Sequence, residues 1–163
     1  DPNDDDITFS VSGGSTETVS GIVSNDTLFI SPAGNYNTSS AIVFSVIATD
    51  VQGAADTTTA NVTVTAVNDA PVIASVSDQN GEEGTELSFN ISATDVDGDN
   101  LSWTSQNLPT GAQFTDNTDG TATFTWTPTY TQSGTYENII FIVDDGSGGR
   151  TQILIGGQKT GRN

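Results

Sequence analysis

The sequence contains no cysteine and no histidine, and only three of its 163 residues are basic. Without cysteine, no disulfide can brace the fold and no thiol can act as a nucleophile. Neither a histidine base nor a Gly-x-Ser-x-Gly motif is present, so the usual arrangements for hydrolysis are missing. The acidic side chains lie in turn-like segments rather than in a large apolar cleft. We therefore expect a protein that is not an enzyme.

Positive charge is scarce, and all of it lies near the C-terminus, at Arg150, Lys159 and Arg162. Against 21 acidic residues this gives a formal net charge of −18. Binding to phosphates needs clustered lysine and arginine, so nucleic acid is not an expected partner. The sequence also has no long apolar run, and we expect no membrane insertion. The high acidity favours divalent cations as partners.

Apolar residues make up 33% of the chain, and they never follow the i, i+3, i+4, i+7 spacing of an amphipathic helix over a long stretch. Isolated valine, isoleucine and phenylalanine alternate instead with threonine, serine and asparagine, between glycine- and aspartate-rich turns. This pattern is typical of many short, half-buried strands. It predicts an all-β protein.

Two acidic clusters, at residues 1–6 and 95–100, are each followed by an alternating strand. They lie 94 residues apart, and the strand ends at 48–50 and 142–144 have the same spacing. Two matches at one spacing indicate a tandem repeat of about the size of one β-domain. The sequence therefore predicts two modules, at residues 1–68 and 69–157, with a tail at 158–163.

The second module has a strand pattern of its own, over residues 72–77, 86–93, 101–105, 121–127, 137–143 and 151–155, with turn residues between the strands. About seven short strands in one module favour an immunoglobulin-like antiparallel β-sandwich. Trp103 and Trp126 alternate with other apolar residues, so we expect them in the core. The alternative is that they form stacking platforms for sugars.

The first module repeats only the later part of this pattern, with strands expected at 7–11, 27–30, 41–49 and 60–66. Counterparts of the first two strands are missing, so this sandwich is predicted to lack its N-terminal strands. Such a gap exposes sheet edges and apolar faces. Either a longer natural chain fills it from upstream, or another molecule adds strands to it.

Acidic residues are predicted to converge at one end of the second module. In such sandwiches the loops after the second and sixth strands lie at the same end, which the linker also enters. Ca²⁺ prefers six to eight oxygen ligands, and these loops are rich in carboxylates. The candidate ligands are Asn68, Asp69, Asp95, Asp97, Asp99 and Asp144, with an equivalent set of Asp1, Asn3, Asp5 and Asp50 in the first module. The alternative is ordinary turn chemistry, for which Asp and Gly are also suited.

Several of these segments resemble known repeats. The Asp-Val-Asp-Gly-Asp loop at 95–99, the Val-Asn-Asp-Ala-Pro joint at 67–71 and the strand end at 48–50 are similar to cadherin-like repeats of bacterial surface proteins. Residues 108–114 and 124–129 resemble the dystroglycan-type cadherin and putative bacterial Ig variants. This resemblance implies tandem cadherin- or Ig-like sandwiches with calcium between repeats, which makes the array rigid.

Together these features predict a structural or adhesive segment of a secreted or cell-surface protein, with neighbouring repeats or subunits as partners. A bacterial origin fits the resemblance. A cell-surface protein or a polysaccharide is a further candidate partner. Two alternatives remain open: an accessory carbohydrate-binding module of a large secreted enzyme, and a filament subunit assembled by strand donation.

Overall fold

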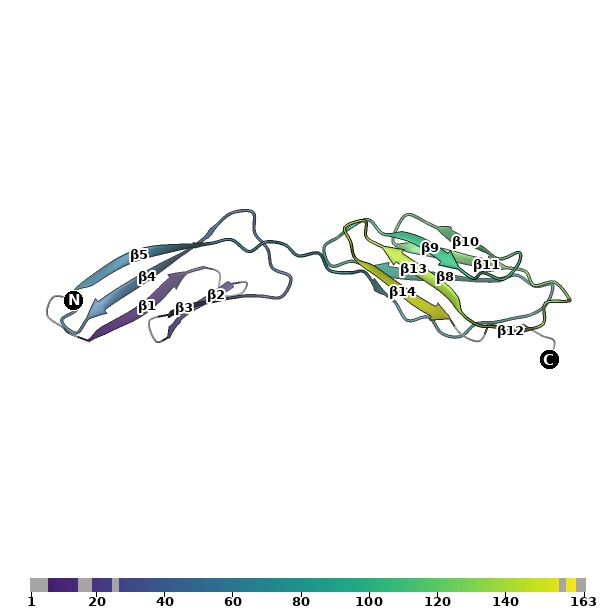
Figure 1. Cartoon of the computed structure of the whole chain (residues 1–163), viewed down its shortest axis with the longest axis horizontal. Helices are drawn as coiled ribbons and strands as arrows, with labels where there is room; N and C mark the ends of the chain where they lie inside the picture. The colour runs from purple at the N-terminus through teal and green to yellow at the C-terminus, as the bar shows by residue number, and fades with distance from the viewer. Residues whose placement is uncertain (1–5, 15–18, 25–26, 156–157, 161–163) are drawn as a thin grey trace. The chain divides into compact units, whose positions relative to one another are not determined.

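The computed structural model describes residues 6–14, 19–24, 27–155 and 158–160, and all regular elements in these segments are β-strands (Figure 1). The chain divides into two compact units, Asp1–Val67 (unit 1) and Asn68–Asn163 (unit 2). The prediction of an all-β protein with antiparallel tandem sandwiches is confirmed. No helix in the described segments has the length and apolar character needed to cross a membrane.

Unit 1 contains a three-stranded sheet in the order β1-β4-β5 and a hairpin of β2 and β3. The strands are β1 (Ile7–Gly13), β2 (Val19–Ser24), β3 (Thr27–Pro32), β4 (Ile42–Asp50) and β5 (Ala55–Val62). The two layers meet at Phe44, which is fully buried, and at Val19. The ring of Phe44 packs over Gly21: a Cβ there would lie 3.0 Å from Phe44 Cε1.

Two features of unit 1 differ from the sequence prediction. Strand β2 was not predicted, because Gly21 and the adjacent Ile22 and Val23 interrupt the alternation of apolar residues. The last strand was predicted at residues 60–66 but is β5, over Ala55–Val62. Residues 55–59 of β5 are exposed and mostly polar. They form a strand because they pair with β4, beginning with Ala55 opposite Thr49.

Unit 2 is a sandwich of two main sheets. One has the order β10-β11-β8-β6 and the other β14-β13-β9, and a small sheet joins β12, β15 and β7. The bounds are β6 (Val72–Ile73), β7 (Asn80–Gly81), β8 (Leu87–Thr94), β9 (Ser102–Gln106), β10 (Gln113–Asp116), β11 (Thr121–Trp126), β12 (Gly134–Tyr136), β13 (Ile139–Asp144), β14 (Arg150–Ile155) and β15 (Gln158–Thr160). Residues 158–160, in the segment expected as a tail, thus form a strand.

Aromatic side chains join the two main sheets of unit 2. Phe124 on β11 and Phe141 on β13 are fully buried, with ring centroids 6.0 Å apart. Phe89 on β8 stacks on Phe124 at 4.9 Å. Trp103 and Trp126 are 5% and 1% exposed, and their indole nitrogens donate to backbone carbonyls. The prediction that both tryptophans lie in the core is confirmed.

The pairing registers of the antiparallel strands show which strands of unit 1 correspond to which strands of unit 2. Ile7 pairs with Asp50 in unit 1, whereas Ser102 pairs with Asp144 in unit 2. One further step along the unit 2 strands sets Leu101 against Asp145. Strand β1 therefore matches β9, β4 matches β13, and Asp50 corresponds to Asp145. The sequence match of Asp50 with Asp144 was wrong by one position, because unit 2 has one more residue between the paired strands.

Candidate functional site

The acidic end of unit 2 is formed by three segments: the entering residues 68–71, the loop between β8 and β9, and the turn between β13 and β14. Hydrogen bonds connect all three. Asn68 Nδ2 donates to Asp145 Oδ2 at 2.8 Å, and the backbone N–H of Asp69 donates to Asp97 Oδ2 at 2.8 Å. The first two residues of unit 2 are thus held by one side chain from each loop.

Asp145 is the buried residue of this end, with an exposed fraction of 4%. Its Oδ1 accepts from the backbone N–H groups of Ser147 at 2.7 Å and Gly149 at 2.9 Å, while Oδ2 accepts from Asn68. The hydrogen bond from Asn68 lowers the pKa of Asp145 below its ordinary value of 3.8, and the backbone hydrogen bonds of the turn act in the same direction. Burial opposes this shift but is outweighed, so the carboxylate is ionised at neutral pH.

Asp144, a candidate metal ligand from the sequence, makes its described contacts within its own turn and to β9. Its Oδ1 accepts from the backbone N–H of Gly146 at 2.9 Å, and its backbone carbonyl accepts from Ser102 Oγ at 3.3 Å. It therefore caps its own turn, and no hydrogen bond of the described residues links it to Asn68. The alternation along β13 indicates why Asp145 is the residue that meets Asn68, because Phe141 and Val143 point inward and Asp145 continues that face.

Asp95 organises the loop between β8 and β9. Its Oδ1 accepts from the backbone N–H groups of Asp97 at 2.8 Å and Asp99 at 3.4 Å. Its Oδ2 is buried and has no hydrogen-bond partner among the described residues. A buried carboxylate oxygen without a donor is unfavourable. One oxygen of Asp95 therefore accepts the hydrogen bonds of its turn, and the other is buried without a donor among the described residues.

The hydrogen-bond pattern of the Asp95 loop occurs at three aspartates among the described residues. Asp50 Oδ1 accepts from the backbone N–H groups of Gln52 at 2.9 Å and Ala54 at 2.8 Å, which repeats the i+2 and i+4 pattern of Asp95 and Asp145. Asp1, Asn3 and Asp5, predicted to join Asp50 in a second metal site, lie outside the described residues. For Asp50 the described contacts are those of a turn.

The oxygen atoms at the acidic end of unit 2 are of the kind that calcium binds, but the acidic side chains alone do not form a complete site. Among the described residues, no group of three or more acidic side chains is arranged to hold a metal ion by itself. Asp95 Oδ2 lies in the loop that also contains Asp97 and Asp99, and Asp97 is hydrogen-bonded to Asp69. Carboxylate, amide and backbone oxygens are all suitable calcium ligands. A cation here would need mixed ligands and water rather than carboxylates alone.

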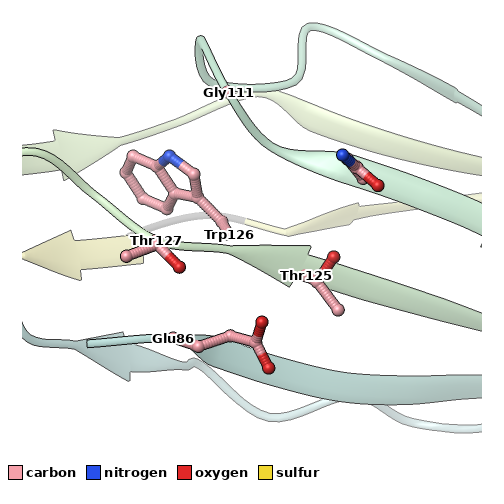
Figure 2. A pocket seen from close by; sticks show the side chains of 6 residues that line it. Glu86, Gly111, Thr125, Trp126 and Thr127 are labelled. Atoms are coloured by element: carbon pink, nitrogen blue, oxygen red, sulfur yellow. The ribbon is translucent and has the colours of Figure 1, made fainter. Parts of the chain in front are cut away.

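A second feature of unit 2 is a small pocket of about 210 Å³ on the sheet that contains β8, β10 and β11. Figure 2 shows the Glu86 carboxylate and the Thr125 and Thr127 side chains around it, with the Trp126 indole alongside. Gly111 and Gln113 complete the lining. The pocket is polar, and Trp126 contributes little surface to it because that side chain is almost fully buried.

Comparisons with known proteins agree with the fold. The family model described as Bacterial Ig domain matches residues 68–155. Protocadherin Gamma B2 extracellular cadherin domains 3–6 are 14% identical, with a TM-score of 0.60, and the match covers 94% of this chain and 39% of that one. Domains 1–5 of the same protein give 13% identity and a TM-score of 0.57, covering 95% and 32%. No curated protein sequence matches the chain.

An endo-fucoidan hydrolase from glycoside hydrolase family 107 is also similar, with 17% identity and a TM-score of 0.47. The match covers 98% of this chain but only 24% of the hydrolase, so the chain spans about a quarter of that protein's length. At these identities the likeness is one of fold alone.

Proposed function

The chain belongs to the bacterial Ig domain family through residues 68–155, and from this premise we propose that it is a non-catalytic structural or adhesive segment of a secreted or cell-surface protein. We propose further that the acidic end of unit 2 binds Ca²⁺. The observation that carries the second part is the buried Asp95 Oδ2, which has no hydrogen-bond partner among the described residues.

Asp95, Asp97 and Asp99 would supply carboxylate oxygens to the ion. Asp69 and Asn68 are the other candidate ligands, because hydrogen bonds already hold both beside these loops. A bound cation would neutralise part of the repulsion between the carboxylates of this end. It would also hold residues 68–71 against the rest of unit 2. Such rigidity suits a structural segment in an array of repeats.

Calcium that binds only the folded protein raises its stability by linkage, by about 2.7 kcal/mol at a concentration one hundred times the Kd. The test is thermal unfolding of the chain with millimolar CaCl₂, with MgCl₂ and with chelator. A higher Tm in calcium than in both other samples supports the proposal. Equal Tm values in calcium and in chelator would contradict calcium binding. They would not contradict the proposed structural role of the segment.

A second candidate function, accessory binding of a polysaccharide, rests on the pocket beside Glu86. Its weakness is the burial of Trp103 and Trp126, because sugar-binding platforms need exposed aromatic faces. Retention of the chain on insoluble polysaccharides, lost in Glu86→Ala and kept in Glu82→Ala, would favour this function over the purely structural one.

A further inference from the structure

The polar side chains around the pocket beside Glu86 differ from those farther along β11. There, Thr123 Oγ1 donates to Asn90 Oδ1 at 3.0 Å and accepts from Asn117 Nδ2 at 3.0 Å. The polar side chains of the pocket make no side-chain hydrogen bond within the described part of the chain; they are Glu86, Gln113, Thr125 and Thr127 (Figure 2). Their donors and acceptors are therefore available to a ligand.

Tyr130 presents an exposed aromatic ring close to this pocket. It is 73% exposed, and its ring lies against Gly84, where a Cβ would be 2.9 Å from the phenolic oxygen and 3.1 Å from Cζ. The backbone N–H of Gly84 donates to the carbonyl of Pro128 at 2.8 Å. Gly84 is two residues from Glu86, so their Cα atoms are at most about 7 Å apart. The ring and the pocket can therefore contact neighbouring units of one extended ligand.

The turn that carries Tyr130 is also held on the Gly111 side of the pocket. Gln132 Nε2 donates to the backbone carbonyl of Thr110, the residue before Gly111, at 3.1 Å. Gln132 Oε1 accepts from the backbone N–H of Thr129 at 2.8 Å, which closes the turn. A ring that is fixed before a ligand arrives loses little freedom on binding. Tyr130 thus provides the exposed aromatic face that the buried tryptophans do not.

Charge restricts the class of ligand. Glu86 is the one charged residue among the described residues that line the pocket. The three basic residues of the sequence, Arg150, Lys159 and Arg162, are not among them. A sulfate or uronate group would meet no cation in this pocket and would be repelled by a chain with a net charge of −18. The hydroxyl groups of an uncharged sugar can donate to the Glu86 carboxylate without this penalty.

We propose that Tyr130 and the Glu86 pocket form one binding site for an uncharged polysaccharide. One sugar unit occupies the pocket of about 210 Å³ and donates its hydroxyl groups to Glu86, while a neighbouring unit stacks on the ring of Tyr130. This inference rests on the second candidate function given above, the binding of a polysaccharide. It adds the aromatic platform of the site and the charge class of the sugar.

The probes are soluble, uncharged hexasaccharides of glucose, mannose and N-acetylglucosamine, each titrated into the full ¹⁵N-labelled chain, with a sulfated hexasaccharide for comparison. We expect saturable amide shift changes at residues 84–86, 111–113 and 125–132 with at least one uncharged probe, and none with the sulfated probe. Absence of saturable changes with every uncharged probe, or equally tight binding of the sulfated probe, would overturn the proposal.

Variants of Tyr130 test the stacking contact. Tyr130→Ala should weaken binding at least about tenfold, whereas Tyr130→Phe keeps the ring and should stay within about threefold of the parent chain. Leu154→Ala is the matched control, because it removes a side chain of unit 2 that is 58% exposed but lies on β14, in the other main sheet. It should bind like the parent chain. Tyr130 is mostly exposed, so its variants should stay folded, which spectra without ligand will check.

Two further outcomes separate this inference from the function on which it rests. Retention on an insoluble polysaccharide that Glu86→Ala abolishes and Tyr130→Ala leaves unchanged would overturn the role of Tyr130, but it would support polysaccharide binding. Failure of the chain to bind any insoluble polysaccharide or hexasaccharide would contradict both, and the structural role of the segment would be unaffected.

Discussion

Asn68 donates a hydrogen bond to Asp145 across 77 positions of sequence, and this contact ties the first residue of unit 2 to the turn between β13 and β14. The amide is the largest cause of the low pKa of Asp145. The contact therefore has a thermodynamic signature that can be measured without any ligand.

Replacing Asn68 with alanine should raise the pKa of Asp145 toward its ordinary value of 3.8. Because the pKa is lower in the folded state, Asp145 stabilises the fold above its unfolded-state pKa and this contribution is lost as pH falls through the folded-state pKa. Asn68→Ala should thus lower the Tm at pH 7 and have a smaller effect near pH 2. An NMR titration of the side-chain carboxyls measures the shift. Asp119, whose pKa is lowered by Thr121, is the internal control and should not change.

Gly149 lies where no side chain fits. A Cβ there would clash with Asp145 Oδ2 and would lie 2.7 Å from Ala70 Cα. Gly149→Ala should therefore push the entering residues away from the turn and destabilise unit 2 by about 1–3 kcal/mol, as overpacking does. Gly81→Ala is the control in the same unit, because the nearest atom to its Cβ position is a Leu87 side-chain carbon at 3.4 Å, an ordinary van der Waals contact. Urea unfolding followed by tryptophan fluorescence measures the difference, and equal stability of the two variants would contradict the packing argument.

The calcium proposal predicts that replacing Asp95 with asparagine affects the Tm differently in chelator and in calcium. Asp95→Asn keeps an oxygen that can accept from Asp97 N–H but removes the charge at the unpartnered position. We expect its Tm in chelator to equal or exceed that of the parent chain, and its gain in Tm on adding calcium to disappear. Asp78→Asn, an exposed acidic residue away from this end, should keep the full gain. A calcium response that survives in Asp95→Asn would place the ion elsewhere.

The different exposures of Phe9 and Phe124 predict unequal costs for deleting the two rings. Phe124→Ala removes a fully buried side chain and should cost about 3–5 kcal/mol. Phe9→Ala removes a ring that is 40% exposed and should cost much less. Both tryptophans lie in unit 2, so fluorescence reports that unit alone, and circular dichroism is needed for unit 1. A loss of similar size in both variants would indicate that Phe9 is covered in the free chain.

Much of the fold follows from local sequence. The alternation of Leu87, Phe89 and Ile91 defines a half-buried strand, because a period of two leaves only one face for the core. The same rule identifies Trp103 and Trp126 as core residues. It does not find β2 or the first half of β5, which are strands because they pair with a neighbour and not because of their apolar pattern.

The candidate site divides in the same way. Local pattern is enough to place the aspartates in turns, since turn chemistry and strand periodicity are local properties. It is not enough to show that Asp145 rather than Asp144 meets Asn68, or that Asp95 has one engaged and one unpartnered oxygen. These features follow from register and burial, which depend on contacts between residues far apart in the sequence. A shift of one position along a strand sends a carboxylate to the opposite face.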